Sequence, residues 1–80
     1  NVRRLYPRLA ALLYQLAERK GEIMIVSPST PLGQQHLACM LGCSRQAVNS
    51  ALRKLASENV IRMEGHRIIV LDPDALKRIA

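Results

Sequence analysis

The stretch "LGCSRQAVNSALRKL", residues 41–55, decides the fold. A glycine, a small residue and a serine precede a helix-forming run. The apolar side of this run is formed by Ala47, Val48, Ala51, Leu52 and Leu55, and the polar side near its start by Arg45, Gln46, Asn49 and Ser50. Ser44 is a good N-cap, because its hydroxyl accepts a backbone N–H from the next turn. We therefore expect an amphipathic helix from Ser44 to about Glu58, with a polar face at its beginning.

A second helix is predicted directly before this one. It covers Gln34–Leu41, with Leu37, Met40 and Leu41 pointing inward, and Gly42 ends it. Two helices joined by a short turn that contains Gly form a helix-turn-helix, and the turn here is residues 41–44. Two apolar runs, "VIRM" (60–63) and "RIIVL" (67–71), follow around "EGH" (64–66). They predict a β-hairpin, which would be the wing of a winged helix-turn-helix.

The remaining segments complete one domain. An apolar stripe at Leu5, Leu9, Leu12 and Leu16 predicts a first helix. Proline is tolerated only in a first turn, so we place its start between Arg4 and Pro7 and its end at Gly21. "EIMIV" (22–26) predicts a strand, "SPSTPLG" (27–33) a loop, and Asp72 followed by Pro73 a last helix reaching Ala80.

The expected fold class is α+β, mainly α: a single domain over residues 1–80, with a three-helix core, a small antiparallel sheet and a short C-terminal helix. The chain lacks Phe and Trp, so its core must be aliphatic, and 49% apolar residues are enough to form one. No run approaches the roughly 18 apolar residues of a membrane helix, and no signal peptide is visible. Two cysteines four residues apart make a poor disulfide framework. These features favour a cytoplasmic protein with no membrane contact.

The charge and the polar face together indicate a nucleic-acid partner. Twelve Lys and Arg against six Asp and Glu give a formal charge of +6, which favours polyanions through counterion release. An α-helix enters the major groove of DNA and reaches base edges from its first turns. Positions 45, 46, 49 and 53 hold Arg, Gln, Asn and Arg, whose side chains bind base edges or phosphates. We therefore predict sequence-specific binding of double-stranded DNA.

Residues 22–80 resemble the C-terminal winged helix-turn-helix of the cyclic-AMP receptor / fumarate–nitrate regulator (Crp/Fnr) superfamily of bacterial transcription factors. The similarity is densest in "LGCSR" and in the spacing of Val48, Leu52, Leu55 and Ile61, and it continues through the "EGH" wing and "LDPDALKRIA". The resemblance implies an upstream effector-binding domain, so no cofactor is expected in this domain itself. It also implies an upstream dimerisation helix, whose end residues 1–6 would be, a homodimer at full length, and RNA polymerase as a candidate partner of the whole regulator.

The resemblance also implies roles for single residues. The base-contacting positions are Arg45, Gln46, Asn49 and Ser50. The phosphate-contacting positions are Gln34, Ser44, Arg53, Gly65, His66 and Arg67. The sequence departs from the family at three positions: Gln46 replaces a common Glu, Ser50 an Arg, and Gly33 a helix-opening Ser or Thr. Gln favours adenine where Glu accepts from cytosine, so the target sequence is expected to differ from that of the best-known members.

Other interpretations stay open beside this one. His36, Cys39 and Cys43 have the spacing of three zinc ligands or of a thiol sensor, but a fourth ligand is not obvious and free Cys usually packs as a small hydrophobe. We expect no metal and a structural role for these residues. The chain has no phosphate loop and is too small for a sizeable pocket, so we expect no enzyme. The rival functions are a winged-helix module for protein–protein contact without DNA binding, and an RNA-binding winged helix.

Overall fold

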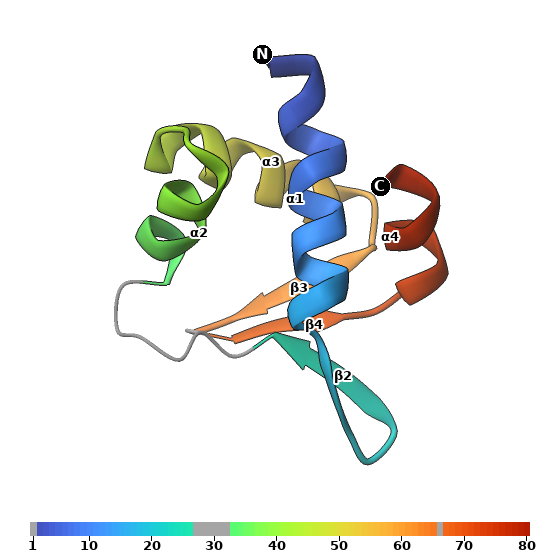
Figure 1. Ribbon diagram of the computed structural model, residues 1–80. Helices are drawn as coiled ribbons and strands as arrows, with labels where there is room; N and C mark the ends of the chain where they lie inside the picture. The colour runs from blue at the N-terminus through green and yellow to red at the C-terminus, as the bar shows by residue number, and fades with distance from the viewer. Residues whose placement is uncertain (1, 27–32, 66) are drawn as a thin grey trace.

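The computed structural model describes residues 2–26, 33–65 and 67–80, which form four helices and one small antiparallel sheet (Figure 1). The elements in chain order are α1 (Val2–Leu16), β1 (Glu18–Lys20), β2 (Ile23–Val26), α2 (Gln34–Leu41), α3 (Arg45–Ser57), β3 (Ile61–Glu64), β4 (Arg67–Val70) and α4 (Pro73–Ile79). This order confirms the predicted winged helix-turn-helix of mainly helical class. Apart from Gly33, the predicted 27–33 loop lies outside the described residues.

The first helix differs from its prediction at both ends. It begins at Val2, so Pro7 lies inside the helix instead of in its first turn. Proline at this position removes one hydrogen bond to the preceding turn, and tertiary packing offsets this loss because Leu5, before the proline, belongs to the core. The helix ends at Leu16 and not at Gly21. The residues that follow Leu16 form β1 and the turn into β2.

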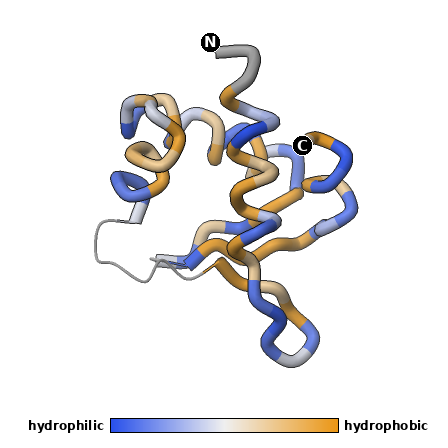
Figure 2. The backbone as a smooth tube through the Cα atoms, in the orientation of Figure 1, coloured by the Kyte–Doolittle hydropathy of each residue, from blue (hydrophilic) through white to orange (hydrophobic). Residues whose placement is uncertain are grey.

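The strand β1 was missed because all three of its side chains are exposed. It therefore has no alternation of apolar and polar residues to mark it. It pairs antiparallel with β2, with Lys20 opposite Ile23, so the connecting loop is Gly21–Glu22. Gly21 has φ +67°, as the first position of a tight type II′ hairpin turn requires. Figure 2 shows the hairpin around this turn as mostly hydrophilic, blue with a pale tip, at the bottom of the view.

The buried stripe of α1 is rotated from the predicted one. Its buried residues are Leu5, Leu9, Ala10 and Leu13. Leu12 is only partly buried, and Leu16 is 39% exposed. Leu5, Leu9 and Leu13 repeat every four residues, and this row faces the other helices because α1 packs against α2, α3 and α4.

The sheet has the order β1-β2-β4-β3, with every neighbouring pair antiparallel. The central strands β2 and β4 are rich in β-branched residues, and Ile68, Ile69 and Val70 are all buried. Because side chains alternate between faces, three consecutive buried residues mean that both faces of β4 are covered. The predicted wing is confirmed as β3 and β4, with Glu64 opposite Arg67.

The core joins the helices to one face of the sheet. Its fully covered side chains include Leu9, Leu13, Leu52, Leu55 and Leu76. Met40, predicted to point inward, is 48% exposed. The buried face of α2 is formed by Leu37, Ala38 and Leu41, and position 40 lies about 100° around the helix from the centre of that face.

Candidate nucleic-acid interface

The turn between α2 and α3 has a defined chemical basis. Gly42 has φ +68°, its N–H donates to the Cys39 carbonyl at 3.3 Å, and the Cys43 N–H donates to the Ala38 carbonyl at 3.0 Å. These two bonds form a Schellman motif, which ends α2 and needs a residue that adopts the left-handed conformation. Ser44 then caps α3, since its Oγ accepts the Ala47 N–H at 3.1 Å. The three residues 42–44 thus determine the direction of α3 relative to α2.

The other end of α3 is fixed in the same way. The Asn59 N–H donates to the Ala56 carbonyl and the Val60 N–H to the Leu55 carbonyl, both at 3.0 Å, with Asn59 at φ +60°. Val60 and Leu55 are both buried, which is the hydrophobic contact that accompanies this motif. Val60 leads directly into β3. The wing is therefore held in a fixed position relative to α3.

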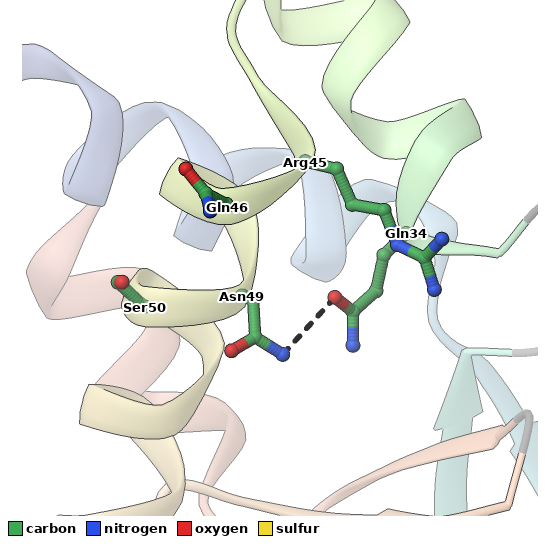
Figure 3. A pocket seen from close by; sticks show the side chains of 5 residues that line it. All are labelled: Gln34, Arg45, Gln46, Asn49 and Ser50. Atoms are coloured by element: carbon green, nitrogen blue, oxygen red, sulfur yellow. Dashed lines mark hydrogen bonds between the residues drawn. The ribbon is translucent and has the colours of Figure 1, made fainter.

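The polar face of α3 is not covered by the rest of the described chain. Arg45, Gln46, Ser50 and Arg53 are exposed and Asn49 is half-buried, whereas Val48, Ala51, Leu52 and Leu55 are buried on the opposite side. The four predicted base-contacting residues line one shallow pocket together with Gln34 of α2 (Figure 3). The structure thus brings together five of the predicted site residues from two helices.

One direct hydrogen bond crosses this pocket. Asn49 Nδ2 donates to Gln34 Oε1 at 3.2 Å, and both side chains are half-buried. Figure 3 shows Arg45 reaching over Gln34, while Gln46 and Ser50 lie on the far side of the helix turn. The pocket therefore has a hydrogen-bonded amide pair on one side and exposed polar side chains on the other.

The wing carries a cluster of charges that the sequence prediction covered only in part. Arg62 Nη2 lies 2.6 Å from Glu64 Oε2, and Arg67 Nη2 lies 3.9 Å from Glu64 Oε1. Arg67 was predicted, whereas Arg62 and Glu64 were missed. Their spacing of two along one strand places them on the same face, so the signal was present in the sequence. Gly65 is exposed at φ +59° in the wing turn, and His66 lies outside the described residues.

The charge distribution along the chain favours an anionic partner for the helix-turn-helix. No Asp or Glu occurs from residue 23 to residue 57, and this stretch contains Arg45, Arg53 and Lys54. All six acidic residues lie in the β1–β2 hairpin or at and after the end of α3. An anion at the polar face of α3 would therefore meet cations and amides before any carboxylate.

Two further cationic side chains, Arg8 and Lys54, make contacts between helices. Arg8 of α1 donates through Nη2 to the Leu41 carbonyl at 3.0 Å, at the end of α2. Lys54 of α3 lies 4.3 Å from the ring centroid of Tyr6, whose hydroxyl donates to Glu58 Oε1 at 2.5 Å. Burial, the Glu58 hydrogen bond and the Glu58 charge raise the pKa of Tyr6 to about 12.

The two cysteines have separate environments. Cys43 occupies the turn position that contacts the preceding helix and packs against the core, whereas Cys39 is exposed. Within residues 2–26, 33–65 and 67–80, no group of three His, Cys, Asp or Glu side chains is placed to hold a metal ion. Over the same part of the chain, no helix is both long and apolar enough to cross a membrane.

Comparison with known proteins gives consistent results. The family profile of the Crp-like helix-turn-helix domain matches residues 7–79. A CRP-like cAMP-activated global transcriptional regulator from Mycobacterium tuberculosis is 37% identical over 75 residues, which are 91% of this chain and 34% of the relative. The chain therefore spans about a third of the length of that regulator.

Solved structures agree on the fold. A CO-sensing protein from R. rubrum superimposes with a TM-score of 0.87 at 25% identity, over 99% of this chain and 37% of the other. A transcriptional regulator of the CRP/FNR family from Thermus thermophilus superimposes with a TM-score of 0.80 at 29% identity, over 96% of this chain and 40% of the other. Both similarities cover the helix-turn-helix and the wing.

Proposed function

This chain belongs to the family of Crp-like helix-turn-helix domains, a family of transcription regulators and not of enzymes, and we propose that it binds double-stranded DNA sequence-specifically through α3. The observation that carries the proposal is the polar face of α3: its first two turns are open, contain no carboxylate and stand opposite a fully packed apolar face. An α-helix presented in this way has the width and the polarity to enter a major groove.

The residue types suggest which bases are read. Arg45 is the side chain suited to bidentate contact with guanine, and Gln46 and Asn49 are suited to adenine. Ser50 is short and accepts or donates one bond, so it contributes less to selection. The predicted target therefore combines guanine and adenine contacts in each half-site.

Phosphate contacts come from both sides of α3. We assign them to Gln34 and Ser44 at the helix starts, to Arg53 about two and a half turns further along α3, and to Gly65, His66 and Arg67 in the wing. Ser44 Oγ accepts the cap hydrogen bond, which leaves its hydroxyl hydrogen for a phosphate oxygen. These contacts would set the position of the helix on the duplex without reading sequence.

The whole regulator would act as a homodimer on two half-sites about one helical turn apart. Relatives of this chain are named as cAMP-activated or CO-sensing, and they are about three times its length. A separate effector domain in the whole protein is therefore part of the proposal. The isolated domain, with four exposed arginines on α3 and the wing (Arg45, Arg53, Arg62 and Arg67), should bind weakly and with strong salt dependence.

Fluorescence anisotropy with a labelled random duplex tests the proposal. If four cations replace counterions, affinity should fall by about 100-fold between 50 and 200 mM salt. Charge reversal at Arg45 and Arg53 should remove most of the binding. A protein–protein module predicts no salt-dependent binding and no effect of these reversals. Competition with duplex RNA of equal length should leave DNA binding intact, whereas strong competition would favour an RNA-binding function.

A further inference from the structure

The hydrogen bond between Asn49 and Gln34 joins a candidate base-reading residue to a candidate phosphate-contacting residue. The two residues come from different helices, and the 3.2 Å bond runs from Asn49 Nδ2 to Gln34 Oε1. Both line the pocket at the start of α3, and both are half-buried. The bond is made between two residues of this chain, so the protein itself orients the Asn49 side chain.

We propose that Gln34 is a positioning residue that fixes the Asn49 carboxamide in the orientation that reads adenine, an inference that rests on the proposed function. A carboxamide has one acceptor oxygen and two N–H donors. Gln34 occupies one N–H, and Figure 3 shows Asn49 Oδ1 turned away from Gln34. The free edge then consists of Oδ1 and the second N–H. This edge matches the N6 amino donor and the N7 acceptor of adenine.

Fixing the amide matters because its terminal torsion has two nearly equivalent states. A half-turn of the Asn49 side-chain amide exchanges oxygen and nitrogen, and the reversed edge no longer matches adenine. With its Oε1 directed at Asn49, Gln34 accepts a hydrogen bond there, and this pairing favours the state in which the Asn49 nitrogen faces Gln34. The bond therefore couples the two amides: the reversed Asn49 edge is reached only if Gln34 turns as well, so that Gln34 Nε2 donates to Asn49 Oδ1.

The same glutamine connects the base contact to the DNA backbone. With its oxygen directed at Asn49, Gln34 has its Nε2 donors free for a phosphate oxygen, which only accepts. A phosphate at this point would hold the Gln34 amide in the same orientation that Asn49 requires. The Gln34 carboxamide would thus bond Asn49 through its oxygen and a DNA phosphate through its nitrogen. Adenine recognition by Asn49 is therefore coupled to the position of α3 along the DNA backbone.

Three variants of α2 separate this role from a plain phosphate contact. Gln34→Ala removes both bonds. Gln34→Glu keeps an acceptor for Asn49 but loses the donor to phosphate. Gln35→Ala is the matched control, because Gln35 is the exposed neighbour of the same type on the same helix. Thermal melting monitored by circular dichroism establishes that each variant is folded.

The measurement is base discrimination at one position. Duplexes selected from a random pool by the wild-type chain and by Asn49→Ala identify the base pair whose preference depends on Asn49. For that base pair, Gln34→Ala should reduce discrimination by about 2- to 12-fold, the loss of one neutral hydrogen bond. Gln34→Glu should keep the discrimination while binding all duplexes more weakly. Gln35→Ala should leave the discrimination unchanged, and the Gln34→Ala/Asn49→Ala double variant should discriminate no worse than Asn49→Ala alone.

Two other outcomes would contradict the inference or the function on which it rests. Uniform weakening by Gln34→Ala, with unchanged discrimination and losses that add to those of Asn49→Ala, would make Gln34 a phosphate contact only and overturn the inference. Failure of the wild-type chain to prefer any selected duplex would instead overturn the proposed function. Failure of the inference is thus seen in the Gln34→Ala variant, whereas failure of the proposed function is seen in the wild-type chain.

Discussion

Glu64 should weaken DNA binding by the wing, and its replacement by Gln should strengthen it. Its carboxylate lies 2.6 Å from Arg62 and 3.9 Å from Arg67, so one acid competes with phosphate for two cations. The three side chains are 60%, 40% and 56% exposed for Arg62, Glu64 and Arg67, which places both ion pairs among surface pairs worth about 0.2–1 kcal/mol each. The longer pair belongs at the low end of that range.

The two ion pairs of Glu64 together determine how much the Glu64→Gln substitution should strengthen DNA binding. Releasing both arginines should stabilise the complex by about 1 kcal/mol, which is about a fivefold lower Kd at low salt. The advantage should shrink as salt rises, because the Debye length is only about 10 Å at 0.1 M. Because Glu64→Gln removes one negative charge from the wing, it should also steepen the slope of log K against log salt by up to about 0.9.

Anisotropy titrations with a random duplex at several KCl concentrations measure both quantities. Glu18→Gln is the matched control: it changes the net charge equally, but Glu18 lies on β1, at the opposite edge of the sheet from β3. If Glu64→Gln binds no tighter than Glu18→Gln, competition at the wing is excluded. Weaker binding would mean that Glu64 holds the arginines in a productive position instead.

Three other outcomes follow from the same structure. Arg67→Ala should raise the Kd of selected and random duplexes by the same factor, as parallel anisotropy titrations would show, since a phosphate contact carries no sequence information. Leu52→Ala should lower the free energy of unfolding in urea by about 2–5 kcal/mol, because the side chain is fully buried; a loss below 1 kcal/mol would contradict the assigned core. The raised pKa of Tyr6, about 12 against an ordinary 10.0, means that the folded state holds this proton more tightly. Its contribution to stability is therefore complete below pH 10 and lost between about pH 10 and 12, and Tyr6→Phe should lessen that fall in urea titrations across this range.

The helix-turn-helix was predictable because its signals are local. Ser44 as an N-cap, Gly42 at the left-handed position and the apolar spacing of α3 each act over one or two turns. The wing was predictable for the same reason, from two apolar runs around a glycine. In these segments local preference and tertiary packing agree, so the sequence alone locates the elements.

The errors occur where packing overrides local preference. Pro7 marked a helix start, but α1 extends to Val2 because Leu5 packs in the core. The exposed strand β1 has no apolar pattern and exists because β2 offers it an edge. Met40 is as apolar as its neighbours but lies off the buried face.

The candidate site was predictable in composition and not in arrangement. Family resemblance named Gln34 and Asn49 separately, but their hydrogen bond depends on how α2 crosses α3. The ion pairs of Glu64 depend in the same way on the register of β3 and β4. Contacts across elements follow from the packed structure and have no signature in a single segment.

The central claim is that the start of α3 reads base edges, and Arg45→Ala tests it most directly. The measured quantity is the ratio of the Kd for random duplex to the Kd for a duplex selected from a random pool, at fixed salt. If Arg45 makes a bidentate contact with guanine, the variant should lose about 1–3 kcal/mol on the selected duplex and clearly less on random duplex, so the ratio falls. Equal losses on both duplexes would contradict the account.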